Sequence, residues 1–405
     1  MTRYGRSPWL DLFPKSRVPS YPQYRGRLTT NVVVIGGGLT GCATAYAFAA
    51  AGIKVVLLEA DRIGRGFTAS AGGWMSDDPG VAFLEVEKLL GLRAARHGFQ
   101  SWRRAALDFV ALLKRLDIKC RVEPRDSLTV AVTPEQTTRL RREIQARKAA
   151  GIDVPVLNAR AVSGEVALSA TFGQRGRDGA TLDPYRACLG LAAAATQRGA
   201  DIHERSAARK TTFGRKWADV HTSDGTIRTD RIVVATGIPT PLFQSLARHF
   251  WFRTSYHALT DPIPAKIRHQ LGGRATVVRD SAQPPHLVRW MDDERILVTG
   301  ADSETPPVRR QQQIITQRTG QLMYELSTLY PDISGIQPAY GWQTAYARTA
   351  EGLPYIGAHR NFPHHVFAFG DSSPGVTGAY LASRIALRHH QGQADSSDRA
   401  FEFTR

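Results

Sequence analysis

The chain has 405 residues, of which 42% are hydrophobic and 22% charged. These values are typical of a soluble globular protein of two or three domains, and they exclude disordered and fibrous proteins. Three scattered cysteines, Cys42, Cys120 and Cys188, match neither a disulfide framework nor a metal-binding motif. They indicate a reducing compartment, so we expect a cytoplasmic protein. We expect no membrane association, since no signal peptide and no apolar run of the ~20 residues that span a bilayer is visible.

The charge is less ordinary, because 53 Lys and Arg residues against 36 Asp and Glu residues give a net charge of +17. A charge of this size is compatible with binding to nucleic acid, to an anionic membrane or to an acidic substrate. The excess is arginine, and the last lysine is Lys266. Many of the arginines lie in helical-looking stretches among Leu, Ala and Glu, which favours solvated helix faces over a binding tail.

The first regular segment after an irregular N-terminal stretch is a βαβ unit that begins at Thr30. Val32 to Ile35 predicts a strand that is buried on both faces, and Ala43 to Ala51 predicts a helix of small residues. A glycine-rich turn separates the two, and a second strand follows the helix. This order is typical of a nucleotide-binding fold.

Helices and strands then alternate. Leu84 to Leu116 predicts two helices broken near Gly91, and Ser127 to Val132 predicts a half-buried strand. Thr133, followed by Pro134 and Gln136, predicts a capping box that starts a helix to about Ala150. Further expected elements are a helix over Pro184 to Arg198, a short strand at Ile202, a turn at Asp224-Gly225 and a buried strand over Ile232 to Ala235.

After this point the sequence pattern changes to one that is typical of a second architecture. Successive antiparallel strands are expected over Trp251 to Thr260, Ala275 to Val278, His286 to Trp290 and Arg295 to Thr299. A pattern typical of parallel α/β structure then returns, with a predicted strand over residues 365–370 and a predicted helix over residues 376–390. We therefore expect an α/β nucleotide-binding domain, assembled from separated pieces, with an antiparallel sheet inserted between them.

Gly36, Gly38 and Gly41 form G-x-G-x-x-G at the strand-to-helix junction. The first glycine permits the tight turn, the second lets a pyrophosphate approach the backbone and the third allows close helix packing. Glu59, 23 residues after Gly36, is placed to accept hydrogen bonds from a ribose. The motif predicts a bound dinucleotide, but NAD and FAD share it.

The later text resembles the FAD-dependent amine and amino-acid oxidoreductases of the D-amino-acid oxidase family, especially the glycine oxidase, sarcosine oxidase and γ-glutamylputrescine oxidase-like branch. The resemblance rests on VVVIGGGLTG with LLEADRIGRG, TLDPYRACLGLAAAATQRGADIHE, RIVVATG, SYHALTDP with RILVTGAD, and EGLPYIG followed by FAFGDSSPGVTGAYLASRIA, in this order. It implies a Rossmann-like FAD-binding domain interleaved with an α+β substrate domain that contains a mainly antiparallel sheet.

The resemblance also implies domain boundaries and a set of cofactor residues. An N-terminal extension (1–27) and a C-terminal tail (397–405) flank an FAD domain (28–116, 184–240 and 350–396) and a substrate domain (117–183 and 241–349). The implied FAD-binding residues are Gly36, Gly38, Gly41, Glu59, Ala60, Arg65, Gly66, Ala71, Gly72, Gly73, Ala208, Ala235, Thr236, Gly237, Gly357, Gly370, Gly375, Val376 and Thr377.

The chain departs from the family pattern at several positions. Thr344 lies near the place where sarcosine-type enzymes attach the flavin through a cysteine, so we expect non-covalent FAD. The family's oxygen-assisting lysine has no counterpart after Lys266, which leaves oxidase and dehydrogenase open. Tyr346 and Ser373 occupy the positions where glycine-oxidase-like enzymes hold a carboxylate with arginines.

Four residues are the candidates for the substrate site. Arg348 lies two residues from Tyr346 and would face the same side of a strand, where it is either a carboxylate clamp or a surface arginine. Tyr256 and His257 begin the segment that resembles the cavity-lining strand, and each is either a site residue or a packed sheet residue. Trp74 and Trp342 would either wall a pocket or fill the core.

The resemblance therefore implies oxidation of a C–N bond in an amine or amino acid, by hydride transfer to flavin N5 followed by hydrolysis of the imine. Two alternatives remain: a flavin-dependent enzyme that modifies tRNA, for which the charge of +17 is suited, or an FAD-containing subunit of a larger dehydrogenase. The amine, the electron acceptor and the oligomeric state are left open.

Overall fold

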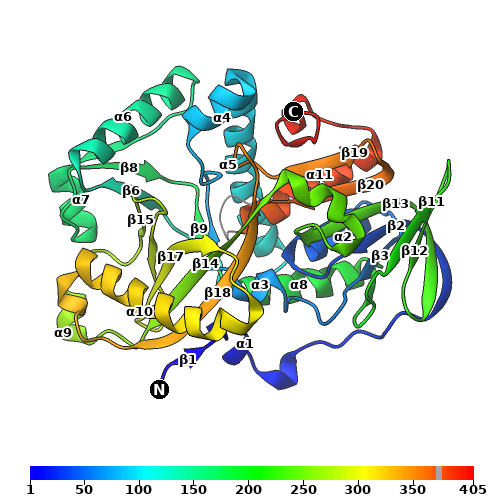
Figure 1. Cartoon of the computed structure of the whole chain (residues 1–405), viewed down its shortest axis with the longest axis horizontal. Coiled ribbons are helices and arrows are strands. Elements are labelled where there is room, and N and C mark those ends of the chain that lie inside the picture. The colour runs from blue at the N-terminus through cyan, green and yellow to red at the C-terminus, as the bar shows by residue number, and fades with distance from the viewer. Residues whose placement is uncertain (371–375) are drawn as a thin grey trace.

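Two large sheets divide the molecule, shown in Figure 1 as a nine-stranded sheet on the left and an eight-stranded sheet on the right. The computed structural model describes residues 1–370 and 376–405. A small third sheet joins β4 (Trp74–Met75), β9 (Ala180–Thr181) and β5 (Glu123–Pro124). Within the described residues, no helix is both long and apolar enough to cross a bilayer.

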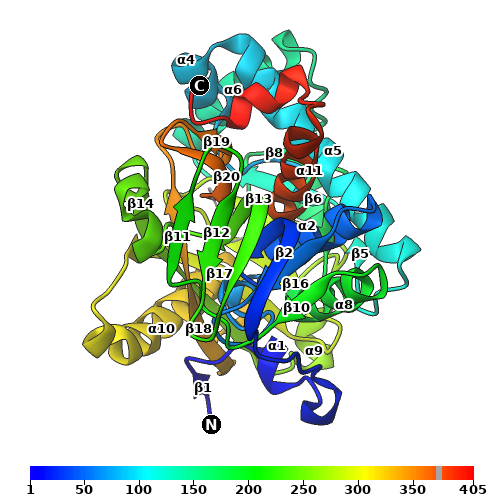
Figure 2. The same ribbon diagram turned by 90° about the vertical axis from the view of Figure 1, so that its right-hand side faces the viewer.

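The eight-stranded sheet has the expected parallel, nucleotide-binding centre. The strand β2 pairs in parallel with β3 and β13, and β13 also pairs in parallel with β20. Figure 2 shows β2, β13, β12 and β11 side by side. The strands are β2 (Gly26–Ile35), β3 (Val55–Leu58), β10 (Asp201–His203), β11 (Lys210–Phe213), β12 (Ala218–His221), β13 (Gly225–Gly237), β19 (Tyr355–His359) and β20 (Phe362–Phe369).

Three helices cluster against this sheet, because α2 contacts both α8 and α11. Nearly every residue of α2 (Leu39–Ala50) is buried, as expected for a helix of small residues enclosed on all sides. The other two are α8 (Pro184–Gln197) and α11 (Thr377–Gln391), and a fourth helix, α5 (Leu92–Arg115), packs on α11. The N-terminus of α2 therefore lies at the carboxyl ends of the parallel strands.

The nine-stranded sheet is mainly antiparallel, as predicted, with two parallel pairs, β15–β6 and β1–β18. The four antiparallel strands expected here are present as β14 to β17; β15, β16 and β17 pair in succession, whereas β14 pairs with β17 and β18. The strands are β1 (Arg3–Tyr4), β6 (Ser127–Ala131), β7 (Val156–Asn158), β8 (Phe172–Gly176), β14 (Trp251–Thr260), β15 (Val277–Asp280), β16 (Leu287–Trp290), β17 (Ile296–Glu304) and β18 (Pro338–Arg348).

The helix α10 (Gln311–Leu329), which the sequence patterns did not predict, packs on β14, β17 and β18. The remaining helical segments are α1 (Pro8–Asp11), η1 (Lys15–Arg17), α3 (Phe67–Ser70), α4 (Phe83–Leu90), α6 (Pro134–Ala149), α7 (Ala159–Val166), η2 (Pro241–His249), α9 (Ala265–Arg268), η3 (Val308–Arg310), η4 (Pro331–Ile333) and η5 (Ser396–Phe401). The strands of the eight-stranded sheet come from residues 26–58, 201–237 and 355–369, and those of the nine-stranded sheet come from residues 3–4, 127–176, 251–304 and 338–348.

Local sequence signals fix several element boundaries. The break between α4 and α5 falls at Gly91, whose φ of +83° is a conformation that glycine adopts without strain. The capping box is confirmed, since the side chains of Thr133 and Gln136 each accept from the other's backbone N–H. The N-terminal stretch, by contrast, is not irregular throughout, because β1 pairs with β18 and Trp9 of α1 is buried.

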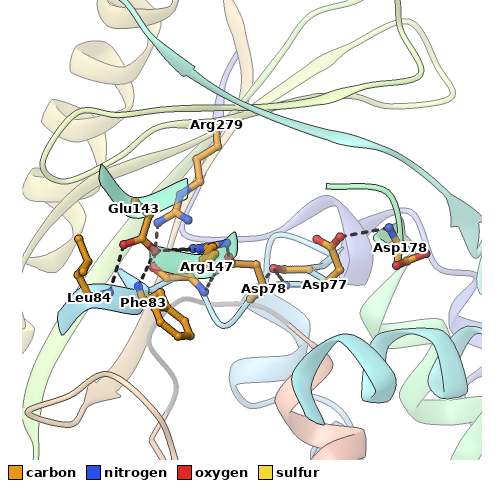
Figure 3. Close-up of polar contacts among 10 residues, drawn as sticks. Asp77, Asp78, Phe83, Leu84, Glu143, Arg147, Asp178 and Arg279 are labelled. Carbon is orange, nitrogen blue, oxygen red and sulfur yellow. Dashed lines mark hydrogen bonds and ion pairs between the residues drawn. The ribbon is translucent and has the colours of Figure 1, made fainter. Parts of the chain in front are cut away.

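A buried ion cluster ties α6 to the segment that follows β4 (Figure 3). Arg147 lies between Glu143, 2.9 Å from its Nε, and Asp78, 2.5 Å from its Nη1. Glu143 also accepts hydrogen bonds from the backbone N–H groups of Phe83 and Leu84 at the start of α4. The cluster therefore fixes the entrance of α4 relative to α6.

We expect Arg147→Met to lower the free energy of unfolding by about 3–5 kcal/mol, because it leaves Glu143 buried without its counter-charge. The matched control is Arg104→Met, which removes the exposed Arg104–Asp108 pair within α5 and should cost less than about 1 kcal/mol. Urea unfolding followed by circular dichroism measures both. Equal losses in the two variants would contradict the role of the cluster.

Candidate active site

The glycine turn between β2 and α2 is packed too tightly for side chains. A Cβ on Gly41 would lie 1.8 Å from the carbonyl oxygen of Gly36, and one on Gly36 would lie 2.7 Å from that of Ala235. Gly36 also has a φ of +109°. Gly38, the residue before α2, has no side chain that could cap the helix, although the N–H of Leu39 donates to the hydroxyl of Thr68 at 2.8 Å. The positive dipole end of α2 is therefore available to an anion.

Glu59 lies directly after β3, beside this turn. One carboxylate oxygen accepts from the N–H of Gly37 at 2.6 Å and the other from the N–H of Asp61 at 2.8 Å. The backbone of Glu59 also bonds to His203 and Ser206, which orders the segment that leads to Ala208. A carboxylate oxygen accepts more than one hydrogen bond, so Glu59 retains acceptor capacity for ribose hydroxyls.

A cavity of about 780 Å³, its open mouth included, runs from the N-terminus of α2 to β18. Most of its lining side chains are apolar. It brings together predicted residues from four distant segments, among them Ala71, Gly237, Tyr346 and Gly370. The full lining is Leu39, Thr40, Phe67, Thr68, Ala71, Gly237, Ile238, Thr344, Ala345, Tyr346, Ala347, Pro354, Ile356, Ala368, Gly370, Val376, Gly378, Ala379 and Ala382.

One wall of the cavity is the junction loop, which we define as Ala69–Gly72. Its four consecutive carbonyl oxygens each accept a hydrogen bond from a side chain far away in the sequence. The donors to Ala69, Ser70, Ala71 and Gly72 are, in order, Ser7 Oγ; Trp342 Nε1 together with Thr344 Oγ1; Trp9 Nε1; and Arg289 Nε together with Nη2. The loop is therefore held by the N-terminal segment, β16 and β18.

His257 lies beneath this loop, fully buried and stacked on Trp342 at a centroid distance of 4.9 Å. Its Nδ1 is 2.8 Å from the hydroxyl of Thr299, and its Nε2 is 2.9 Å from that of Thr344. Because Thr344 donates its single proton to Ser70, it accepts from His257, so Nε2 carries the imidazole proton. Burial and the charge of Arg289 lower the pKa of His257 to about 3. His257 is therefore a neutral link between the sheet and the junction loop.

Tyr346 carries the polar group of the cavity. Its hydroxyl donates to Oδ2 of Asp302 on β17 at 2.6 Å. Burial, followed by the nearby charge of Asp302, raises the pKa of Tyr346, so the phenol keeps its proton. Arg253 is the register partner of Tyr346 on β14, and directly opposed residues share one face of a sheet.

Arg348 shares this face as well, two residues further along β18. The long contact between its Nη2 and Glu85, 3.9 Å, and its half-exposed side chain place it at the rim. The sheet face thus changes outward from stacked rings, through hydroxyl groups and the Tyr346–Asp302 pair, to two arginines.

The structure separates some predicted residues from this group. Tyr256 lies in the core cluster beneath α10, with its hydroxyl 3.2 Å from Ser303, and is not among the cavity-lining residues. Strand alternation explains this, because Tyr256 and His257 point to opposite faces. In the same way Gly357 lies away from the lining, whereas its neighbour Ile356 is part of it. Gly375 and Ser373 lie outside the described residues.

The other predicted cofactor residues lie in the turns and strand ends near the cavity-lining segments. Gly73 binds Leu182 through its carbonyl oxygen, Gly370 donates to Gly237, and Thr377 donates to Ser76. Trp342 holds the junction loop, and Trp74 packs on Gly179 in the third sheet. Ala60, Arg65 and Gly66 follow β3 on the way to α3, and Ala235, Thr236 and Gly237 end β13.

Sequence reasoning missed two polar residues. Asp302 follows a left-handed Ala301 at an irregularity between β14 and β17, and nothing in the local sequence predicts that register. Arg289 lies within a strand that the sequence predicts from its alternating pattern. The signal that could have marked it is its charge, at a position whose neighbours on the strand face the core.

The parallel sheet and the glycine turn at the start of α2 define a dinucleotide-binding protein. Residues 31–388 match the sequence model of the DAO family, described as FAD dependent oxidoreductase, and the chain belongs to this family. It is 25% identical over 379 residues to the gamma-glutamylputrescine oxidoreductase of Escherichia coli strain K12, covering 92% of this chain and 86% of that protein.

Two further similarities extend over most of the chain. Glycine oxidase of Bacillus licheniformis is 23% identical, over 88% of this chain and 92% of that protein. The solved structure of L-amino acid deaminase from Proteus vulgaris superimposes with a TM-score of 0.76 at 16% identity, over 96% of this chain and all of the other. This last likeness concerns the fold.

FAD is the cofactor of this family, and the residues present fit it. Gly36 to Gly41 and the N-terminus of α2 would hold the pyrophosphate, and Glu59 would hold the ribose. Most of the residues that line the cavity between the junction loop and Gly370 are glycine, alanine or threonine, which suits the flat ring system of a flavin.

We expect Gly41→Ala to yield protein without bound FAD, because the new Cβ would meet the carbonyl oxygen of Gly36 at 1.8 Å and force the turn open. The ratio of absorbance at 450 nm to that at 280 nm in purified protein measures flavin content. The matched control is Gly320→Ala in α10, where the new Cβ meets nothing within 4 Å. That variant should retain FAD and gain about 0.5–1 kcal/mol of stability. A Gly41→Ala variant that contains a full complement of bound FAD would contradict the assignment of the turn.

Proposed function

We propose that this protein oxidises the C–N bond of an amine or amino acid. The observation that carries the proposal is the single cavity that joins the dinucleotide end of α2 to the Tyr346–Asp302 pair. The similarity to a gamma-glutamylputrescine oxidoreductase and a glycine oxidase supports this substrate class over the modification of tRNA.

When bound, FAD supplies the hydride acceptor, flavin N5. The substrate loses a hydride from carbon and a proton from nitrogen, and water then hydrolyses the resulting imine to a carbonyl compound and an amine. The protein's part is to present a neutral amine, since an ammonium group has no lone pair to stabilise the developing imine. The apolar lining favours that neutral form, because burial lowers the pKa of an amine.

Tyr346 is placed to orient the amine. Its proton is committed to Asp302, so its oxygen is left as an acceptor toward the cavity. The amine N–H would donate to this oxygen, while the carboxylate of Asp302 attracts the cationic substrate before it loses a proton. Tyr346 is thus an acceptor that Asp302 orients, and its raised pKa excludes a role as a phenolate base near neutral pH.

Three finer properties belong to the same proposal. FAD is bound without a covalent link, since Thr344, in the cavity wall, has no nucleophile comparable to a cysteine thiolate. The protein works in the cytoplasm, which is supported by three buried, unpaired cysteines. The electron acceptor is oxygen or another oxidant.

The proposed function is tested by mixing the purified protein with a panel of amines and amino acids under anaerobic conditions and following the loss of absorbance at 450 nm. At least one member should bleach the flavin, and its product should react as a carbonyl compound. A protein that contains FAD but is bleached by no amine would overturn the proposal and favour an electron-transferring subunit.

We expect Tyr346→Phe to raise the KM for the best amine about five- to tenfold, which corresponds to one hydrogen bond of roughly 1 kcal/mol. Steady-state kinetics with that amine measure the change. The control is Tyr324→Phe in α10, an exposed tyrosine whose change should leave KM unaltered. Unchanged kinetics in Tyr346→Phe would remove this residue from the site.

Arg253 and Arg348 supply positive charge at the rim, so substrates with a carboxylate should depend on them. We expect the double variant Arg253→Met, Arg348→Met to raise KM at least about tenfold for amino acids. A simple amine of the same length should be unaffected, because it has no group at that end. Arg309→Met, at an exposed position in η3, is the control. Equal effects on both substrate types would show that the rim does not bind a carboxylate.

A further inference from the structure

Arg289 is a buried cation whose nearby carboxylates, Asp183 and Asp292, act on its charge without forming an ion pair with it. Only 4% of it is exposed, and among the described residues it makes no ion pair within 4.0 Å. Its guanidinium donates two hydrogen bonds to one carbonyl oxygen, that of Gly72, at 3.1 and 2.8 Å. Trp9 covers it, with the ring centroid 5.7 Å from Cζ. Buried arginines are ordinarily paired with carboxylates, because an uncompensated buried charge costs several kcal/mol.

The charge of Arg289 is directed at the cavity wall. Gly72, which it holds, is the neighbour of Ala71 in the lining, and a Cβ on Gly73 would lie 2.8 Å from Nη2. His257 lies on the opposite side of Gly72. It is uncharged at neutral pH, so it does not change the net charge around Arg289. Burial lowers the pKa of Arg289 to about 10, which still leaves it protonated.

We propose that Arg289 is a positioning residue that fixes the junction loop against the flavin and whose unpaired positive charge favours the reduced, anionic form of the cofactor. Two contributions follow from one side chain. The fork of N–H groups sets the position of the Gly72 carbonyl, and the net charge acts through a dry medium in which charges interact more strongly than in water. The reduced cofactor thereby adds a negative charge to the partial compensation that Asp183 and Asp292 give.

Two substitutions separate the contributions. Arg289→Gln keeps an N–H donor for the Gly72 carbonyl and removes the charge. Arg289→Lys keeps a cation and loses the two-pronged contact. The matched control is Arg279→Gln, since Arg279 on the adjacent strand β15 also donates to a backbone carbonyl, that of Gly80 at 2.8 Å, but it lies in the α6 region shown in Figure 3.

The primary readout is the flavin midpoint potential, measured by slow anaerobic reduction of the FAD-loaded protein against a reference dye. We expect Arg289→Gln to lower the equilibrium constant for flavin reduction at least about tenfold, which is about 30 mV for a two-electron couple. Arg289→Lys should lie nearer to the unmodified protein. Its dissociation constant for FAD, from titration of the flavin-stripped protein, should rise about tenfold because the grip on the loop is lost.

Arg279→Gln should change neither quantity. A potential in Arg289→Gln within twofold, as an equilibrium constant, of the unmodified protein would overturn the electrostatic part. Equal shifts in Arg279→Gln and Arg289→Gln would show that any lost arginine has this effect, and would also overturn it. If Arg289→Gln does not fold, a dissociation constant for FAD that is unchanged in Arg289→Lys overturns the positioning part. None of these readouts needs an amine, so they are independent of the substrate proposal.

Discussion

Four consecutive carbonyl oxygens, those of Ala69–Gly72, decide how the two large sheets meet. A buried carbonyl without a partner costs about 1–3 kcal/mol, and here every partner is a side chain from the N-terminal segment or from the nine-stranded sheet. The nine-stranded sheet, which carries Tyr346, therefore also positions the loop that follows the nucleotide-binding unit. The positions of these two parts of the cavity wall are fixed relative to each other. The N-terminal stretch belongs to this arrangement as well, because Ser7 and Trp9 supply two of the donors.

What the sequence predicts well is local chemistry. The G-x-G-x-x-G turn requires glycines because backbone atoms lie where Cβ atoms would be, and this requirement is written into three residues and their spacing. The capping box at Thr133 and the break at Gly91 are of the same kind, since each depends on neighbours within a few positions. The resemblance to a family added the cofactor and the general composition of the cavity, which local signals alone did not distinguish from an NAD site.

What the sequence does not predict is which face of a strand meets the cavity. Tyr256 and His257 are adjacent and equally plausible, yet one lies under α10 and the other under the junction loop, because strand alternation depends on a register set by β17 and β18. For the same reason the cavity is lined by Ile356 and not by the predicted Gly357, its neighbour on the strand. Asp302 is further from prediction, since the irregularity at Ala301 shifts the alternation of β17 by one position. The partner of Tyr346 is therefore a product of tertiary structure.

The excess of arginine has an interior explanation as well as a surface one. Arg147, Arg388 and Arg405 bind buried carboxylates, and Arg289 and Arg405 bind backbone carbonyls on two sides of the cavity. Arg405 donates to the carbonyls of Leu353 and Pro354, and Pro354 lines the cavity. Lysine would serve poorly in these positions, because its ammonium lacks the planar fork that holds a backbone oxygen in a fixed direction and loses its proton more readily on burial. Part of the arginine content thus serves to hold the interior and the cavity walls together, and that part carries no weight as a sign of nucleic-acid binding.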